Sequence, residues 1–349
     1  MYREIEKWEN IFSYFYIDGK IYTKIEKNSI LKELSLTGEV FWESEETEVR
    51  YYYVNNDVII FNLESLEDKY TYNRTFIYDR RKKTLIFKGE IKLILYKEEC
   101  FDGNILYSST NENIIIFDIL KGEILKKIDK PIIGVTLLVT EKYVIKGYDP
   151  YIYIYVKNDF SLLWQQNIQD FFPGEEELSI LEIYSYKDTF IIIARVGIVC
   201  LSQKDGSLIW KCDHYARTME IVGHYGYVCT SLSFYRVDLD NGEKYGYGRK
   251  YDRLPDFEYN GETYWPAGYK VVYHKGLLWY RVYSSGESFI LAIDPETGEY
   301  KWIHKVETYE KVMDIKFYDD KMFLLDSGNT LFIYEEDTFL SRDYKESIS

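Results

Sequence analysis

Two segments hold the residue types best suited to binding a protein partner. In segment 171–177 the candidate contact residues are Phe171, Phe172, Glu175, Glu176 and Glu177. In segment 244–270 they are Tyr245, Tyr247, Tyr251, Tyr264 and Trp265, interleaved with arginine and acidic residues. Aromatic side chains are enriched at the energetic centres of interfaces, and carboxylates around them attract a basic partner. We predict that these residues form a partner-binding surface. The alternatives are a solvated loop for 171–177 and, for 244–270, a connection between blades that packs on itself.

The histidines and cysteines lack the spacing that metal binding or catalysis requires. The histidines are His214, His224, His274 and His304, far apart in the sequence, whereas zinc and iron sites use imidazoles at short, defined spacing. The cysteines, Cys100, Cys200, Cys212 and Cys229, form no short pair, so we interpret them as reduced thiols in the core. Neither a nucleophile elbow nor a phosphate-binding loop is present. We predict no catalytic residue, no metal and no cofactor.

The charge balance and the first residues restrict the partner and the compartment. The formal net charge is −15, from 58 acidic and 43 basic residues. A negative field of this size disfavours nucleic acid and anionic membranes and favours a basic protein. The N-terminus carries Arg3, Glu4, Glu6 and Lys7 where a signal peptide needs an apolar run, and no apolar stretch is long enough to span a bilayer. We therefore expect a cytoplasmic protein.

The elements that must position these residues come from a repeat. Glycine precedes tryptophan by four residues in three strand–turn–strand segments, with the pairs Gly38 and Trp42, Gly206 and Trp210, and Gly298 and Trp302. Each repeat also begins at a polar turn followed by an apolar strand. These turns are Asp18-Gly19, Asn55-Asn56, Asp102-Gly103, Glu141-Lys142, Lys187-Asp188, Tyr225-Gly226, Lys275-Gly276 and Asp319-Asp320. Their mean spacing of about 43 residues is the length of one propeller blade.

The repeat predicts an all-β fold, a single β-propeller domain over residues 1–349 with eight four-stranded blades. Seven blades are the alternative, because the second repeat is irregular. Its last two strands must be taken from TFIYD and TLIFK, on either side of the basic turn Arg80–Lys83. The first ten residues precede the first repeat, so we expect them to pair with the last blade and close the ring, which leaves no long free edge.

The segment from Ala292 to Trp302, AIDPETGEYKW, resembles the docking motif of the PQQ-like (quinoprotein-type) β-propeller repeats, in which Ala, Asp, Gly and Trp recur at these offsets. The fifth repeat departs from the motif at Cys200 and Ser202, and the first retains only its glycine and tryptophan. The resemblance implies the scaffold. Enzymes of this family bind PQQ and calcium, often beside adjacent cysteines, and no adjacent cysteines occur here. No quinone chemistry is expected.

Two functional hypotheses follow. The first is a non-catalytic protein-binding propeller in the bacterial cytoplasm, in a specific form an immunity-type inhibitor that masks a basic toxin. The alternative is a carbohydrate-binding or carbohydrate-active propeller enzyme, with a central pocket lined by carboxylates and tyrosines. Carboxyl groups with a raised pKa would favour the enzyme, whereas an exposed aromatic patch would favour the binding protein.

Overall fold

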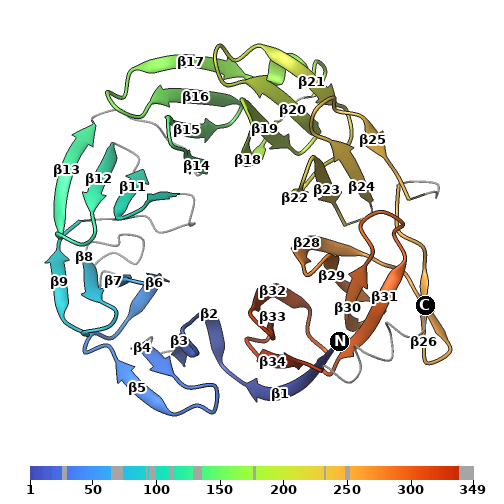
Figure 1. Ribbon diagram of the computed structural model, residues 1–349, viewed down its shortest axis with the longest axis horizontal. Coiled ribbons are helices and arrows are strands. Elements are labelled where there is room, and N and C mark those ends of the chain that lie inside the picture. Colours follow the sequence, from blue (N-terminus) through green and yellow to red (C-terminus); the bar gives the residue numbers. More distant parts are fainter. Residues whose placement is uncertain are drawn as a thin grey trace. The chain divides into compact units, whose positions relative to one another are not determined.

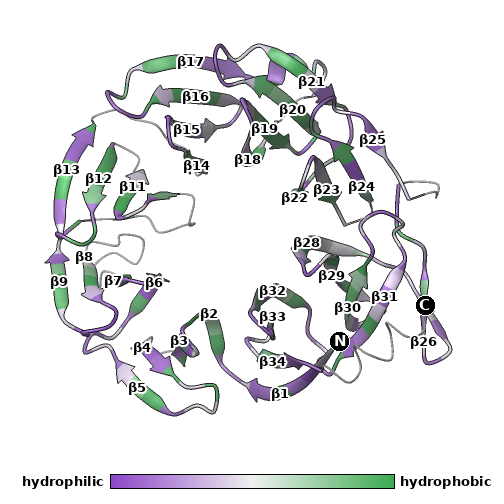
Figure 2. Ribbon diagram, viewed as in Figure 1, coloured by the Kyte–Doolittle hydropathy of each residue, from purple (hydrophilic) through white to green (hydrophobic). Residues whose placement is uncertain are grey.

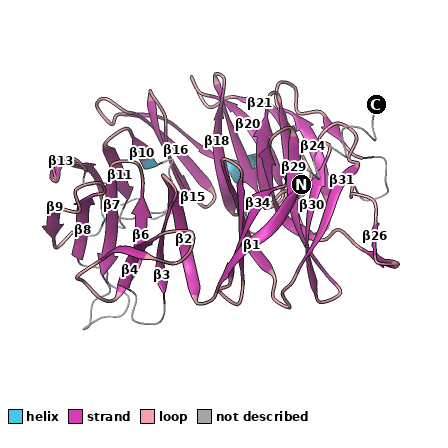
Figure 3. Ribbon diagram, turned by 60° about the horizontal axis from the view of Figure 1, so that its bottom comes forward, coloured by secondary structure: helices cyan, strands magenta, loops and turns pink. Residues whose placement is uncertain are grey.

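The structure is a computed structural model, and it describes residues 1–25, 30–63, 74–91, 93, 100–109, 113–128, 136–175, 178–231, 233–247 and 252–337. Strands make up nearly all of the regular structure (Figure 3). Tyr, Phe, Ile and Val dominate them, because branched and aromatic side chains fit a pleated, half-buried surface. One short 3₁₀ helix, η2 (Ile168–Phe171), follows β17.

The strands form eight four-stranded antiparallel sheets, the blades of a β-propeller, which we number in chain order (Figure 1). The first strands are β2 (Ile11–Ile17), β6 (Val49–Val54), β10 (Phe101–Asp102), β14 (Thr136–Val139), β18 (Ile180–Tyr186), β22 (Thr218–Val222), β28 (Gly268–His274) and β32 (Val312–Tyr318). The second strands are β3 (Lys20–Ile25), β7 (Val58–Leu63), β11 (Ile105–Ser109), β15 (Tyr143–Tyr148), β19 (Thr189–Ala194), β23 (Tyr225–Cys229), β29 (Leu277–Ser284) and β33 (Lys321–Asp326).

The third and fourth strands complete each blade. The third strands are β4 (Ile30–Leu34), β8 (Arg74–Asp79), β12 (Ile114–Asp118), β16 (Tyr151–Val156), β20 (Gly197–Ser202), β24 (Phe234–Asp238), β30 (Glu287–Ile293) and β34 (Leu331–Glu336). The fourth strands are β5 (Val40–Glu43), β9 (Leu85–Gly89), β13 (Glu123–Ile128), β17 (Leu162–Asn167), β21 (Leu208–Cys212), β25 (Lys244–Tyr245), β31 (Tyr300–Val306) and, in the eighth blade, β1 (Tyr2–Trp8). The prediction of eight blades is confirmed, and the irregular second repeat is a complete blade with its basic turn between β8 and β9.

Six of the eight predicted turns lie wholly between the first and second strands of a blade. The third overlaps the end of β10 at Asp102, and the sixth is displaced. In the sixth blade Tyr225 and Gly226 belong to β23, and the turn is formed by Gly223 and His224. A two-residue hairpin turn needs positive φ, which Gly223 provides at 62°. Gly226 instead packs inside the blade, where an added Cβ would lie 2.2 Å from the Met219 sulfur.

The first residues complete the last blade, as predicted. Strand β1 pairs antiparallel with β34, from Tyr2 opposite Glu336 to Trp8 opposite Leu331. Beyond β1, the Ile11 N–H donates a hydrogen bond of 2.8 Å to the Asn329 carbonyl. The N-terminal segment is therefore held in the same blade as the end of the described chain.

By internal contacts the chain divides into two units, which we describe separately. The unit of blades 1–4 comprises the described residues of 12–185 together with 204–206; the other unit comprises residues 1–11, 186–203 and the described residues from 207 onward. In both, the second and third strands carry the core, and in β20 every residue from Gly197 to Leu201 is buried. Figure 2 shows hydrophobic residues concentrated on middle strands such as β12 and β20. The fourth strands lie at sheet edges, and three of them, β5, β13 and β17, are largely exposed.

The glycine–tryptophan spacing is explained by contacts between neighbouring blades. The aromatic residue of one fourth strand packs on the turn glycine of the next blade, a contact that we call a blade joint. A Cβ added to Gly206 would lie 2.8 Å from the Trp164 ring, and one added to Gly242 would lie 2.7 Å from the Trp210 ring. The Trp210 indole N–H also donates to the Leu239 carbonyl at 3.0 Å. Both glycines have positive φ, so glycine relieves backbone strain and admits the ring.

Two further blade joints use other aromatic residues. Tyr247 packs on Gly298 and donates a hydrogen bond of 2.9 Å to the Pro295 carbonyl. Tyr247 thus replaces the tryptophan that is missing from the sixth repeat. Phe87 packs in the same way near Gly122, whose added Cβ would lie 3.1 Å from the Phe87 Cβ.

At two blade joints the positive-φ residue of the turn is not glycine. Lys83 has φ 58°, and its ammonium lies 5.4 Å from the centre of the Trp42 ring. Phe160 has φ 60°, and the Lys126 ammonium lies 5.3 Å from its ring centre. A cation–π contact therefore replaces the glycine–aromatic contact wherever a side chain occupies the turn.

Candidate partner-binding surface

Part of the predicted aromatic segment, residues 257–264, forms a separate hairpin between the sixth and seventh blades. Its strands are β26 (Phe257–Tyr259) and β27 (Glu262–Tyr264), which pair only with each other among the described residues. The turn consists of Asn260 at φ 52° and Gly261 at φ 83°. Positive φ at both central residues defines the hairpin turn that matches strand twist, and Asn-Gly is its preferred sequence.

One side of the hairpin packs on the seventh blade. Phe257 and Tyr264 are buried, and their rings lie 5.2 and 4.6 Å from the Phe289 ring in β30. Tyr300 in β31 contacts Phe257 at 5.8 Å and hydrogen-bonds the Pro255 carbonyl. Tyr264, one of the predicted contact residues, is therefore buried on the side of the hairpin that packs against the seventh blade.

The Tyr264 hydroxyl ties the hairpin to strand β30. It lies 2.6 Å from a carboxylate oxygen of Glu287 and 2.8 Å from one of Glu262. The hydrogen bond to Glu287 raises the pKa of Tyr264, since it stabilises the protonated phenol. Lys305 pairs with the other Glu287 oxygen, and that hydrogen bond holds the pKa of Glu287 below its usual range. The hairpin is therefore fixed by both apolar and ionic contacts.

The other side of the hairpin region is aromatic and acidic. Trp265 is 43% exposed, and the Arg253 guanidinium lies 5.5 Å from its ring centre. Asp256 pairs with the same Arg253 at 3.6 Å, and Asp256, Glu258 and Glu262 are exposed residues of this segment. The segment therefore presents an exposed indole directly after β27, beside the Arg253 guanidinium.

The remaining predicted residues of this segment have different surroundings. Tyr247 belongs to the blade joint with Gly298. Tyr245 is half-buried, 5.6 Å from the guanidinium of Arg236, which pairs with Glu296 at 2.6 Å. Tyr251 lies outside the described residues.

The second predicted segment belongs to the other unit and follows β17. Phe171 ends the helix η2 and is half-buried, whereas Phe172 is buried at 5% exposure. The Gln169 side-chain amide donates to the Phe172 and Glu175 carbonyls at 3.2 and 2.7 Å, which holds the loop close to the helix. Glu175 is exposed, and Glu176 and Glu177 lie outside the described residues.

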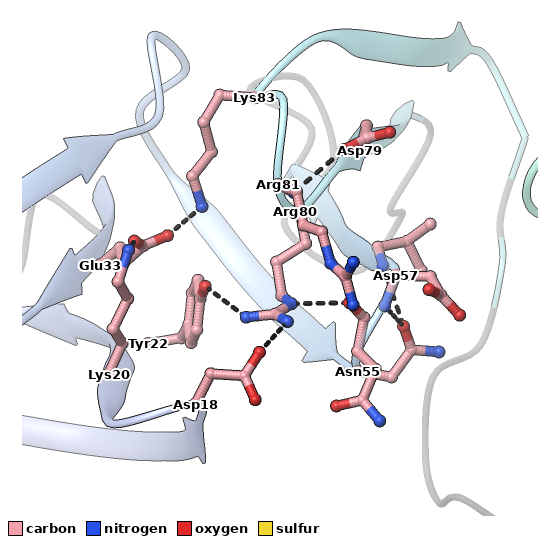
Figure 4. A network of polar contacts seen from close by, with 12 residues as sticks. Asp18, Lys20, Tyr22, Glu33, Asn55, Asp57, Asp79, Arg80, Arg81 and Lys83 are labelled. Atoms are coloured by element: carbon pink, nitrogen blue, oxygen red, sulfur yellow. Dashed lines mark hydrogen bonds and ion pairs between the residues drawn. The ribbon is translucent and has the colours of Figure 1, made fainter.

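A dense cluster of ionisable groups joins the first and second blades (Figure 4). The Glu33 side chain is 1% exposed; it accepts from Lys20 at 2.5 Å and from Lys83. Burial alone would raise the pKa of Glu33, but the hydrogen bonds from Lys20, Lys83 and Tyr22 outweigh it and lower the pKa. Glu33 is therefore held as a carboxylate.

A buried arginine extends the same cluster. Arg80 is 4% exposed; it pairs with Asp18 and donates to the Tyr22 hydroxyl at 3.3 Å and to the Asn56 carbonyl at 2.9 Å. Since both Glu33 oxygens and several arginine N–H groups already have protein partners, this cluster is suited to joining blades rather than to chemistry on a ligand.

The histidines pack against aromatic rings. His304 stacks on Trp302 at 5.0 Å, and His274 stacks on Phe317 at 4.2 Å. Burial lowers the pKa of both imidazoles. Over the described ranges, no three His, Cys, Asp or Glu side chains are gathered as metal ligands would be. The four cysteines are buried and unbridged.

Comparison with known proteins identifies the fold but no family. No protein-family model matches the chain, and no curated protein matches it. Among solved structures, the computationally designed Ika8 protein is similar over 95% of this chain and 98% of its own, with a TM-score of 0.68 and 13% identity. BamB from Moraxella catarrhalis is similar over 96% of this chain and all of its own, with a TM-score of 0.66 and 10% identity. In the part of the chain that the structure describes, no helix has the length and apolar character to cross a bilayer.

Proposed function

We propose that this chain is a non-catalytic, protein-binding β-propeller whose partner surface is centred on the β26–β27 hairpin. The supporting observation is the exposed Trp265 ring beside Arg253, in a segment that also exposes the carboxylates of Asp256, Glu258 and Glu262. Rigid aromatic anchors provide most of the binding energy at interfaces, and nearby charges accelerate association with a partner of opposite sign.

The segment after β17, in the other unit, is proposed as a second contact region. Phe171 and the exposed Glu175 repeat the combination of aromatic and acidic groups. Glu176, Glu177 and Tyr251 are included on the basis of the sequence alone.

In its specific form the proposal is an immunity-type inhibitor in the bacterial cytoplasm that masks a basic toxin. The net charge of −15 supports a basic partner. We further propose that the blades are PQQ-like repeats used only as a scaffold. The turn between β30 and β31 supports this, because Asp294 accepts the backbone N–H groups of Glu296 and Thr297 at 3.0 and 2.9 Å, while Gly298 receives Tyr247.

The carbohydrate hypothesis has less support. A catalytic acid would need a carboxyl group with a raised pKa. Among the described residues, every carboxyl group with a shifted pKa has it lowered, as in Asp294 and Asp18.

Capture from a lysate of the source organism, followed by binding measurements with the purified partner, tests the proposal. We expect a basic protein, and Trp265→Ala should weaken its binding by about 1–4 kcal/mol. Replacing Asp256, Glu258 and Glu262 together by Ala should mainly slow association and reduce its salt dependence.

Matched controls separate the hairpin from general surface effects. Tyr309→Ala removes an aromatic side chain that is 94% exposed elsewhere. Replacing the exposed Glu39, Asp57 and Asp188 by Ala removes the same charge from other blades. Equal binding by the wild type and both hairpin variants would rule the surface out.

A further inference from the structure

Among the described strands, each fourth strand lies at one edge of its sheet, and one of them lacks the usual protection. Strand β17 hydrogen-bonds only to β16 among the described strands. Natural edge strands are commonly protected from pairing by charged residues or proline. Strand β17 reads LLWQQN, without charge, proline or glycine, whereas each of the other seven fourth strands carries at least one charged residue.

The exposed residues of β17 suit a strand partner. Leu162 and Leu163 are 45% and 41% exposed, and Gln165 is also exposed. The bulge is confined to the start of the strand, where the register shifts at Leu163. From Trp164 to Asn167 the pairing with β16 is regular, so this edge presents a continuous strand.

In the seventh blade, another segment of the chain covers the start of the fourth strand, β31. Tyr300 follows the β30–β31 turn as Leu162 follows the β16–β17 turn, two residues before the tryptophan of its strand. The segment leading into the β26–β27 hairpin covers Tyr300 through Phe257 and Pro255. The start of a fourth strand in this protein can therefore be covered by side-chain contacts from a segment outside the blade.

The charges near β17 indicate which segment would bind. Asp170 lies one helical turn beyond the strand, where its carboxylate accepts from the Asn167 amide at 3.0 Å, and the exposed Glu175 follows. A second copy would bring its own acidic residues and a net charge of −15, which opposes self-pairing. A basic segment would be attracted instead.

We propose that the edge of β17 is a strand-addition site for an extended segment of a basic protein, with apolar side chains near Leu162 and Leu163 and basic side chains near Asp170 and Glu175. This deepens the proposed function and rests on it for the class of partner. Main-chain hydrogen bonds would supply the affinity, and the apolar and acidic ends of the β17 region would set the direction in which the bound segment runs.

Synthetic peptides test the site on the full chain. The probe alternates valine and threonine and ends in lysines; one control peptide has a central proline, and another ends in glutamates. We expect the probe to bind, and both controls to bind at least about tenfold more weakly. Gln165→Lys, which adds the charge found on other edges, should weaken probe binding by about tenfold. Leu208→Lys, at the equivalent of Leu162 in β21, should leave it unchanged.

Each contrary result overturns the inference. One such result is a probe peptide that does not bind, or a proline peptide that binds as tightly as the probe. Another is a Gln165→Lys variant that, with native thermal unfolding, binds the probe as the wild type does, or a Leu208→Lys variant that loses as much probe affinity as Gln165→Lys. A wild-type dimer in sedimentation that Gln165→Lys converts to monomer would assign the edge to self-association instead. Loss of natural-partner capture in Trp265→Ala tests the hairpin independently, so failure here is distinguishable from failure of the proposed function.

Discussion

The blade joints at Gly242 and at Lys83 solve the same packing problem with different chemistry. At Gly242 the Trp210 ring packs directly on the turn backbone and is 7% exposed. At Lys83 the turn carries a long cationic side chain, which lies over the half-buried Trp42 ring and ends on the buried Glu33. The first contact depends on shape and apolar burial, the second on charge.

The residue with positive φ determines which chemistry is used. Glycine has no Cβ, so the ring of the preceding blade can approach the backbone. A lysine in the same conformation occupies that space, and its buried charge needs a partner. Glu33 provides the partner, and Lys20 and Tyr22 satisfy the rest of the Glu33 carboxylate. We expect the two joints to respond differently to truncation, added bulk and pH.

The largest effect is expected from Trp210→Ala at the apolar joint. Removing this buried ring leaves a cavity and an unpaired Leu239 carbonyl, so stability should fall by about 3–5 kcal/mol. Urea unfolding followed by circular dichroism measures it. Trp265→Ala, which removes a more exposed indole, is the control and should cost less than about 1 kcal/mol. Equal losses would contradict a special role for the joint.

Gly242→Ala should cost about 2–4 kcal/mol in the same assay. The new methyl group would lie 2.7 Å from Trp210, on a backbone with φ 79°. Gly38→Ala isolates the backbone part, because Gly38 has φ 85° in the equivalent turn of the first blade and no atom within 4 Å of an added Cβ. That control should cost only about 1–2 kcal/mol. If both variants lost the same stability, close approach of the ring would not explain the glycine.

At the ionic joint, Glu33→Gln should destabilise by about 2 kcal/mol. The amide keeps the shape but cannot neutralise Lys20 and Lys83, both of which retain some access to solvent. Glu39→Gln, an exposed acid in the adjoining turn, is the matched control and should be neutral. A neutral result for Glu33→Gln would show that the cluster does not hold the blades together.

The smallest effect is a pH dependence confined to the ionic joint. The folded-state pKa of Glu33 lies below its usual value, so the unfolded chain binds this proton first. The stabilisation by Glu33 is complete above the unfolded pKa of about 4.3 and is lost as pH falls through the lower folded value. Acid titration of the free energy of unfolding should therefore show a smaller difference between wild type and Glu33→Gln below about pH 4 than at pH 7. A constant difference would mean that the Glu33 pKa is not lowered.

Much of the fold was predictable because a hairpin is a local structure. Turn residues and alternating apolar strands lie within a few positions of each other, so the eight repeats and the second blade around Arg80–Lys83 could be recognised. The displaced turn at Gly223 was missed, because either glycine of that segment fits a tight turn by sequence alone. Packing against Met219 explains why Gly226 lies in the strand.

The candidate surface was only partly predictable. The aromatic composition marked segment 244–270, but nothing local distinguished Tyr264, which is buried on Phe289, from the exposed Trp265. Likewise, Tyr247 could not be recognised as the joint residue of the sixth blade, because its glycine partner is in the next blade. The sequence shows that residues 162–167 carry no charge, but only the structure shows that they form the fourth strand of a blade, at the edge of its sheet.

The sequence by itself determined the β class, the repeat length, most of the turns and the acidic charge, since each depends on residues close in the chain or on composition. The tertiary structure alone decided which ring meets which turn, that Glu33 is buried between two lysines, and which side of the β26–β27 hairpin remains exposed. The physical reason is range: hairpin geometry is set within a few residues, whereas burial and pairing between blades depend on side chains tens of residues apart.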